Sequence, residues 1–314
     1  MSRQTPVIAI RCDGNAQLAS GHLMRCLSIA GELAQRGAEV FFCFADEESE
    51  RWFRGKEFPR EILRSDFRDP RGELPVLAEC LRKRQADAIL IDHYHVDDSY
   101  LAELKERDPE LGICVLDDFL SSGRPADLMI NYTLPGRAAD TPLRQQFREH
   151  RMSVRPKVQR IFVSTGGSDP CGMREALTVL LKEILPEAEI CIPQGIEEMA
   201  AYMASCDLAV SAGGTTVYEL CAVGVPTILF TMADNQQVLA ESVKNAVENA
   251  GDVRSEAGKR YALKKIGTFI TMMAGDIGLR TQTSERMKQM TDGHGAERIA
   301  DRILGLIRSS GTRE

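Results

Sequence analysis

A small-residue turn, Ser211-Ala-Gly-Gly-Thr-Thr-Val-Tyr-Glu219, follows the apolar run Leu208–Val210 and leads into Leu220-Cys-Ala-Val-Gly-Val-Pro-Thr-Ile-Leu-Phe230. A buried strand, a turn, a helix and a second strand fit this order of apolar and small residues. Gly224 and Pro226 mark the end of the helix, because both residue types interrupt helical structure. The sequence therefore predicts a βαβ unit around this turn.

The turn combines backbone freedom with the polar groups that a nucleotide sugar needs. Gly213 and Gly214 allow a ligand to approach the backbone closely. Thr215 and Thr216 offer hydroxyl and N–H groups at a helix N-terminus, which attracts phosphate. Glu219 comes about one helical turn after Thr215, so its carboxylate can accept hydrogen bonds from a ribose diol. These residues fit equally well a tight turn followed by a solvated glutamate.

Length and composition suit a soluble two-domain protein. The chain has 314 residues, enough for two α/β domains of about 150 residues each. Its hydrophobic fraction of 43% is ordinary, and its net charge of −7 argues against a surface for nucleic acid or anionic membranes. Nine cysteines without C-x-x-C spacing indicate reduced core residues. Pro6–Ile10 is too short for a signal peptide, and no apolar run approaches the length of about 18 residues that a membrane span needs. We therefore expect a cytoplasmic protein.

Strand-like and helix-like segments alternate along the chain. We expect strands at 7–10, 40–44, around 62, 88–91, 113–116, 128–130, 161–163, 189–192, 208–210 and 227–230. Helices are expected at 21–36, 74–84 and 99–107 and through the tail, 258–308. Continuous apolar strands separated by helices predict parallel, doubly wound sheets.

The alternation predicts two Rossmann-like α/β domains. Residues 1–145 would form the N-terminal domain, 146–290 the C-terminal nucleotide-binding domain, and 291–314 a helix that packs back on the N-terminal domain. Two doubly wound domains that face each other place the carboxyl ends of both sheets on a shared cleft. We therefore expect active-site residues in the loops that follow strands.

The loop after the first strand runs from Arg11 to His22 and lacks the G-x-G-x-x-G pattern of a dinucleotide site. Ser20 fits an N-cap, which would place His22 in the first turn of the helix, where the dipole disfavours imidazolium. A neutral imidazole at a cleft is what a general base requires. A histidine that caps or packs is the alternative.

The segment Ile91-Asp-His-Tyr-His-Val-Asp-Asp98 follows a later strand. His93 and His95 invite a metal interpretation, but no other segment supplies an obvious His or Cys partner. We therefore expect no metal, and favour hydrogen-bonding roles in the cleft for Asp92 and Tyr94. Asp117-Asp118 fits either a capping strand end or a contact with substrate.

Two further polar turns follow strands in the second half of the chain. Thr165-Gly-Gly-Ser-Asp169 can bind a diphosphate through its backbone N–H groups. We therefore expect Gly166, Gly167 and Ser168 to contact the substrate. In Ala233-Asp-Asn-Gln-Gln237, the amides of Asn235 and Gln236 can bind sugar hydroxyl or acetamido groups. Three such turns in one βα domain favour a nucleotide-sugar site over isolated tight turns.

The chain resembles the UDP-sugar hydrolases of the pseudaminic acid pathway, which share the two-Rossmann GT-B architecture with MurG-type glycosyltransferases and spore-coat polysaccharide proteins. The resemblance covers nearly the whole chain, and its motifs occur in the family's order. They are Ile8-Ala-Ile-Arg-Cys-Asp-Gly14, Gly21-His-Leu-Met-Arg25, Ile91-Asp-His-Tyr94, Leu116-Asp-Asp118, Gly166-Gly-Ser-Asp169, Ser211–Glu219, Asp234-Asn-Gln236 and Thr291-Asp-Gly293.

The resemblance implies metal-independent hydrolysis of UDP-2,4-diacetamido-2,4,6-trideoxy-β-L-altropyranose to UDP and the free sugar, with inversion and without a cofactor. By this resemblance His22 would activate the attacking water, with Tyr94 and Asp13 positioning water or sugar. It places Gly21 and Arg25 in the substrate site as well. The remaining implied contacts are the phosphates with Gly214, Thr215 and Thr216, the ribose with Glu219 and the uracil near Ile196.

Two segments are shorter here than in the family. The segment 132–143 lacks a strand and a Gly-x-x-Tyr element, and only Cys191-Ile-Pro-Gln-Gly195 bridges a region where the family has an extra helix and strand. The second domain is therefore expected to be abbreviated beside the uracil site. A UDP-sugar glycosyltransferase on the same fold and an inactive sugar-nucleotide binder are the alternative functions.

Overall fold

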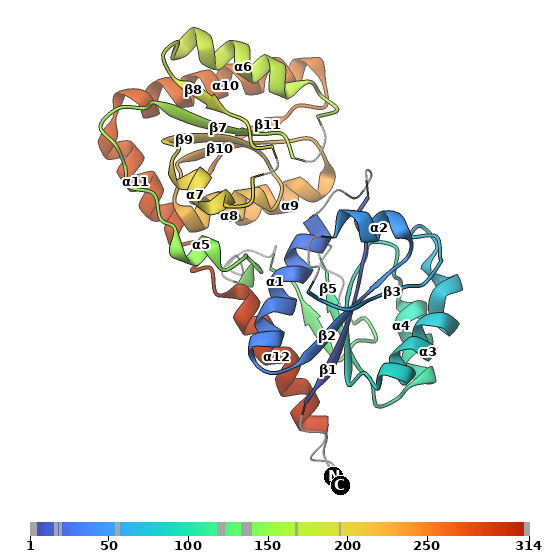
Figure 1. Cartoon of the computed structure of the whole chain (residues 1–314). Coiled ribbons are helices and arrows are strands. Elements are labelled where there is room, and N and C mark those ends of the chain that lie inside the picture. The colour runs from blue at the N-terminus through green and yellow to red at the C-terminus, as the bar shows by residue number, and fades with distance from the viewer. Residues whose placement is uncertain are drawn as a thin grey trace. The chain divides into compact units, whose positions relative to one another are not determined.

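A computed structural model of the chain describes residues 5–15, 18, 21–53, 57–117, 123–132, 140–166, 169–194 and 196–310. The chain divides into two compact units, and we describe each by itself. The first unit comprises Met1–Asn131 and Ala296–Glu314, and the second comprises Tyr132–Gly295. The last helix of the chain therefore belongs to the first unit (Figure 1).

The first unit contains a six-stranded parallel sheet in the order β3-β2-β1-β4-β5-β6. Its strands are β1 Val7–Cys12, β2 Glu39–Phe44, β3 Arg60–Ile62, β4 Ala88–Asp92, β5 Gly112–Leu116 and β6 Leu128–Ile130. Its helices are α1 Gly21–Gln35, α2 Glu47–Trp52, the 3₁₀ turn η1 Pro70–Glu73, α3 Leu74–Arg84, α4 Asp98–Arg107 and α12 Gly295–Ser310. This strand order is that of a Rossmann fold, with its topological switch point between β1 and β4.

Both faces of this sheet are covered, which explains the continuous apolar runs in its central strands. Val7 and Ala9 of β1 belong to a core that includes Leu77 of α3 and Leu101 of α4. Ile8, the intervening residue, is fully buried, and α1 and α12 lie on that side of the sheet (Figure 1). Side chains alternate between the faces of a strand, so a sheet covered on both faces needs an unbroken apolar run.

The second unit contains a five-stranded parallel sheet in the order β11-β10-β9-β7-β8. Its strands are β7 Arg160–Ser164, β8 Glu189–Cys191, β9 Leu208–Ala212, β10 Thr227–Thr231 and β11 Glu248–Asp252. Its helices are α5 Gln146–Glu149, α6 Met173–Ile184, α7 Met199–Ala204, α8 Thr216–Val223, α9 Asp234–Ser242, α10 Glu256–Gly275 and α11 Ile277–Lys288. Helices α6 and α10 cover one face, and α7, α8 and α9 cover the other (Figure 1). This order is the other common doubly wound arrangement, with its switch point between β7 and β9.

The predicted fold class of two Rossmann-like doubly wound units is confirmed. The shortened segment after residue 190 leaves a continuous sheet, because β8 pairs in parallel with β7. Strand β11 was not predicted, since Glu248-Asn-Ala-Gly-Asp252 contains no apolar run. None of the helices that the structure describes is long and apolar enough to cross a membrane.

Candidate active site

His22, Arg25 and Asp92 meet at the switch point of the first unit. His22 and Arg25 lie three residues apart near the start of α1, and Asp92 is the last residue of β4. The His22 Nδ1 lies 2.6 Å from Asp92 Oδ1, and the Arg25 Nε donates to Asp92 Oδ2 at 2.5 Å. Arg25 Nη2 also donates to Asp92 Oδ1, so the guanidinium holds both carboxylate oxygens. The carboxylate therefore fixes both the ring and the guanidinium.

Asp92 is 1% exposed, so its charge depends on these partners. Burial alone would raise the pKa of Asp92, but Arg25 and His22 outweigh it and hold the pKa well below its usual range. Cys26 contributes a weaker contact from Sγ to Asp92 Oδ2 at 3.4 Å. The carboxylate is thus ionised at neutral pH.

The contacts of the His22 ring assign its tautomer. Nδ1 faces Asp92 at 2.6 Å and Arg25 Nη2 at 3.1 Å. A nitrogen cannot donate and accept at once, and both Asp92 oxygens are acceptors, so Nδ1–H donates to Asp92. Nε2 then carries the lone pair, and the described residues supply no hydrogen-bond partner to it. A nitrogen with this arrangement can accept a proton from water or a hydroxyl.

The Tyr94 ring packs against the His22 imidazole. Its ring meets the His22 ring edge-on, with centroids 4.4 Å apart and an interplanar angle of 79°. Tyr94 is 41% exposed, whereas His22 is 5% exposed. Tyr94 therefore separates the imidazole from part of the solvent while keeping an accessible face of its own.

Asp13 lies in a buried charge cluster, and its carboxylate is fully engaged there. Its Oδ2 accepts from Arg11 Nη1 at 2.6 Å and its Oδ1 accepts from the Ala45 N–H at 2.8 Å. Burial would raise the pKa of Asp13, but Arg11, His93 and the Ala45 N–H together hold it well below its usual range. Arg11 is also held by Glu73, at 2.7 and 2.8 Å. These contacts fix the Asp13 carboxylate at the start of the loop after β1, and its role in positioning water or sugar stays a prediction.

His93 joins the same buried charge cluster. Its Nδ1 accepts from the His95 N–H at 3.1 Å, and its Nε2 lies 3.2 Å from Asp13 Oδ2. Burial lowers the pKa of His93, opposed by its contact with Asp13. Within the described ranges, no group of three or more His, Cys, Asp or Glu side chains could hold a metal ion.

The turn that precedes α8 lies at the carboxyl end of β9, beside the switch point of the second unit. Gly213 N–H donates to Phe230 O and Gly214 N–H to Ala212 O, both at 2.8 Å. A Cβ on Gly213 would lie 3.2 Å from Gln236 Cβ, whereas one on Gly214 would meet no atom of the described residues within 4 Å. Gly213 therefore permits close packing against α9, whereas the described residues leave the space beside Gly214 unfilled.

Thr215 and Thr216 begin α8, and both are half-buried. As far as the structure describes the chain, the Thr215 side chain makes no capping hydrogen bond. The helix N-terminus therefore retains N–H groups that an anion can use.

Glu219 is a partly buried carboxyl one turn into α8, with no hydrogen bond from any described residue. Burial raises the pKa of Glu219 to about 7, against the opposing charge of Arg144. A carboxylate without a partner gains from any donor that a ligand brings. The Glu219 carboxylate can therefore accept hydrogen bonds from the two hydroxyl groups of a diol.

The other predicted residues of the second unit are placed as follows. Gln236 Oε1 accepts from the Met232 N–H at 2.8 Å, so only its amide NH₂ is available to a ligand. Gly166 follows β7 with φ of 76°, and Ile196 is half-buried before α7. Ser20, Asp118, Gly167, Ser168 and the Asn235 side chain lie outside the described residues.

The structure thus brings the predicted residues together in two groups. In the first unit, His22 and Arg25 contact Asp92, Tyr94 contacts the His22 ring, and Gly21 begins the helix that carries His22 and Arg25. In the second unit, Gly213 lies against Gln236, and Gly213, Gly214 and the N-cap Thr215 lead into α8, which contains Thr216 and Glu219. The sequence predicts a hydrogen-bonding role for Asp92, and the structure adds its partners, His22 and Arg25.

Comparisons with known proteins agree with this architecture. Residues 161–266 match the family model of the glycosyltransferase family 28 C-terminal domain. MurG of Acinetobacter baumannii has a similar structure, with a TM-score of 0.70 and 14% identity over 96% of this chain and 99% of that chain. The spinosyn rhamnosyltransferase SpnG, complexed with thymidine diphosphate, gives a TM-score of 0.64 and 15% identity over 96% and 100%. The fold is therefore that of the GT-B glycosyltransferase class.

One sequence relative matches nearly the whole chain. The chain is 22% identical to the uncharacterized protein MJ1062 of Methanocaldococcus jannaschii, with 96% of this chain and 69% of that protein covered.

Proposed function

We propose that the protein is a metal-independent hydrolase that releases UDP from a UDP-sugar with inversion at the anomeric carbon. The observation that carries this proposal is the His22–Asp92 pair, 2.6 Å apart, with the second ring nitrogen of His22 left as a proton acceptor. The resemblance of the sequence supports UDP-2,4-diacetamido-2,4,6-trideoxy-β-L-altropyranose as the substrate. The match of residues 161–266 to a glycosyltransferase domain supports nucleotide-sugar binding by the second unit.

In the proposed reaction, a water molecule gives a proton to His22 Nε2 while its oxygen bonds to the anomeric carbon. The bond from that carbon to the UDP oxygen breaks, and its electron pair leaves on the diphosphate. The imidazolium that forms is stabilised by Asp92, which also holds the ring in place. Tyr94 and Arg25 act as positioning residues for the imidazole and the carboxylate.

The leaving diphosphate gains negative charge, which the start of α8 suits. Thr215 and Thr216 present N–H and hydroxyl groups there, and Gly214 leaves room for a phosphate. The ribose diol would donate to Glu219. Gly166, Gly167, Ser168, Asn235 and Gln236 remain proposed contacts of the diphosphate and sugar, and Ile196 of the uracil.

The test is the release of UDP from the diacetamido UDP-sugar without an added acceptor, followed by NMR that resolves the anomers. Wild type should form UDP and initially the inverted sugar, and His22→Ala should lose the activity while still binding UDP in calorimetry. His150→Ala serves as the matched control, because among the described residues the His150 ring forms a hydrogen bond to Gln146 O of the preceding helix, at 3.0 Å. Equal rates in wild type and His22→Ala would refute the role of His22.

Glycosyl transfer is the second candidate, and the match to a glycosyltransferase domain favours it specifically. A transferase would use the same His22–Asp92 pair to deprotonate an acceptor hydroxyl in place of water. Release of UDP only when an acceptor is added would establish transfer and exclude hydrolysis. Absence of UDP binding at millimolar UDP would exclude both enzymes and favour the inactive binder.

A further inference from the structure

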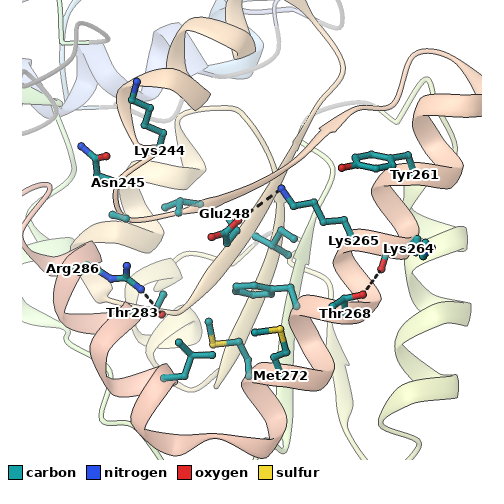
Figure 2. Close-up of a pocket in the computed structure, with 16 residues that line it drawn as sticks. Lys244, Asn245, Glu248, Tyr261, Lys264, Lys265, Thr268, Met272, Thr283 and Arg286 are labelled. Carbon is teal, nitrogen blue, oxygen red and sulfur yellow. Dashed lines mark hydrogen bonds and ion pairs between the residues drawn. The ribbon is translucent and has the colours of Figure 1, made fainter.

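A cavity of about 490 Å³ opens in the second unit beside the edge strand β11 (Figure 2). Its walls come from β11 and the residues before it, from α10 and from α11. This volume lies in the range of small-molecule sites, roughly 300–1,000 Å³. None of the described residues that line it belongs to the predicted substrate site.

The interior of the cavity is apolar. Phe269 and Met273 of α10 line it and are 7% and 4% exposed. Met272 and Tyr261 of the same helix also line it but are 56% and 64% exposed, and Leu279 adds an apolar wall from α11. Exposed apolar side chains that continue into an apolar cavity mark a binding site, and methionine adapts to flexible chains.

The rim of the cavity is cationic, although the whole chain carries a net charge of −7. Four lysine or arginine side chains and one acidic side chain line it: Lys244, Lys264, Lys265, Arg286 and Glu248. Lys265 lies 3.8 Å from Glu248, and Lys244 pairs with Glu241. Among the residues that the structure describes, Lys264 and Arg286 have no ion-pair partner. The positive charges of Lys264 and Arg286 can therefore bind an anion at the rim.

Arg286 has the geometry to hold that anion. Among the described residues, the Arg286 side chain forms one weak hydrogen bond, from Nη2 to Thr283 Oγ1 at 3.4 Å (Figure 2). The other N–H groups of the Arg286 guanidinium donate to no described residue, and their fork matches a carboxylate or phosphate.

A peptide strand added to the edge of the sheet is a poorer fit for this cavity. The Asn249 carbonyl, on β11, already accepts from Lys265 Nζ at 2.6 Å. A cation placed over an edge strand blocks the backbone groups that another strand would need.

We infer that this cavity binds a single-chain amphiphile with an anionic head group, the hydrocarbon chain against Phe269 and Met273 and the head at Arg286. The cationic rim matches the head, and the apolar interior matches the chain. The site is independent of the proposed hydrolysis, because its lining residues and those of the UDP site differ.

The test is calorimetric titration of the full chain with dodecanoate below its micellar concentration. Arg286→Gln should weaken binding about ten-fold or more, because a hydrogen-bonded charge pair is lost. Arg260→Gln is the matched control, since Arg260 is also exposed but does not line the cavity. Thr268→Phe should fill the cavity and weaken binding at least ten-fold, while Thr271→Phe, an exposed neighbour outside the lining, should change it less than two-fold.

Several outcomes would overturn the inference. They are no binding of dodecanoate at millimolar concentration, or equal effects of Arg286→Gln and Arg260→Gln. Flotation with phosphatidylglycerol vesicles distinguishes a membrane from a free amphiphile, and vesicle binding without binding of monomeric dodecanoate would contradict a single-chain site. UDP titration of the same variants should give wild-type affinity, which shows that they are folded and separates this inference from the proposed enzyme.

Discussion

Replacing Glu219 by glutamine is expected to stabilise the second unit above neutral pH, at the expense of ligand binding. Glu219 is a partly buried carboxyl without a hydrogen-bond donor from the described residues, and burial raises its pKa to about 7. Ionising it in place is therefore unfavourable, whereas an amide of the same shape carries no charge.

The magnitude follows from linkage between the pKa and folding. The pKa rises from 4.5 to about 7, so the folded protein keeps a proton that the unfolded chain releases. The stabilising effect of this proton is complete below about pH 4.5 and is lost as the pH rises through about 7. A shift of about 2.5 units, at about 1.36 kcal/mol per unit, sets an upper limit of roughly 3.4 kcal/mol. In a unit of this size that corresponds to a change in melting temperature of roughly 7–14 °C.

Thermal unfolding of wild type and Glu219→Gln from about pH 5 to pH 8.5 measures this effect. The two proteins should melt together at the acid end, and the variant should melt progressively higher as the pH rises through 7. Glu183→Gln is the matched control, because Glu183 is an exposed glutamate on α6 of the same unit and should show no such trend. A melting difference that does not depend on pH, or a variant less stable at pH 8, would refute the burial argument.

The same substitution separates stability from binding. The Glu219 carboxylate that destabilises the empty protein should accept hydrogen bonds from a ribose diol, so Glu219→Gln should bind a UDP-sugar more weakly. Affinity of wild type should rise with pH through about 7 as the carboxylate ionises, and the variant should lose this dependence. Unchanged affinity in the variant would remove Glu219 from the proposed site while leaving the stability prediction intact.

Three further substitutions test the buried charges and one close contact. Asp92→Asn should lower kcat for UDP release by roughly 10²–10⁴-fold with UDP affinity retained, because an amide does not stabilise the protonated ring; a loss of less than ten-fold contradicts this. Glu73→Gln should lower the free energy of unfolding by about 3 kcal/mol in urea titrations, since its buried arginine partner keeps its charge. Gly224→Ala should cost more than Gly37→Ala in the same assay. Both have φ near 85°, at 85° and 83°, but only at Gly224 would a Cβ overlap a side chain, that of Lys288; equal losses would show that this overlap is relieved at no cost.

The fold could be predicted from the sequence because both sheets are buried on their two faces. A strand such as Val7–Cys12 is then buried at every position and apolar except at Arg11, which distinguishes it from the amphipathic helices around it. Strand β11 could not be predicted in this way because it lies at the edge of its sheet, where only Ala250 of its five residues is buried. An edge strand needs less apolar surface, so its sequence carries a weaker signal.

The partners of the site residues could not be predicted, because they depend on strand order. Asp92 and His22 are separated by 70 residues, and Arg11 and Glu73 by 62. Spacing along the chain gives no information on such pairs, whereas the sequence did place His22 after the first strand and Asp92 after a later one. Only the pairing of β1 with β4 brings these two strand ends together.

That pairing also explains why two aspartates in similar positions have different roles. Asp92 lies opposite Cys12 in the sheet, so Asp13 and Asp92 leave adjacent strand ends. Arg11 projects from β1 itself and holds Asp13 in the buried cluster, where the Ala45 N–H occupies its other oxygen. Arg25 reaches Asp92 from α1, and the same helix brings His22 to one of the oxygens that Arg25 binds. Both carboxylates contact an imidazole, and the element that supplies the arginine decides which one: Asp13 contacts His93 in the buried cluster, and Asp92 contacts His22 at the start of α1.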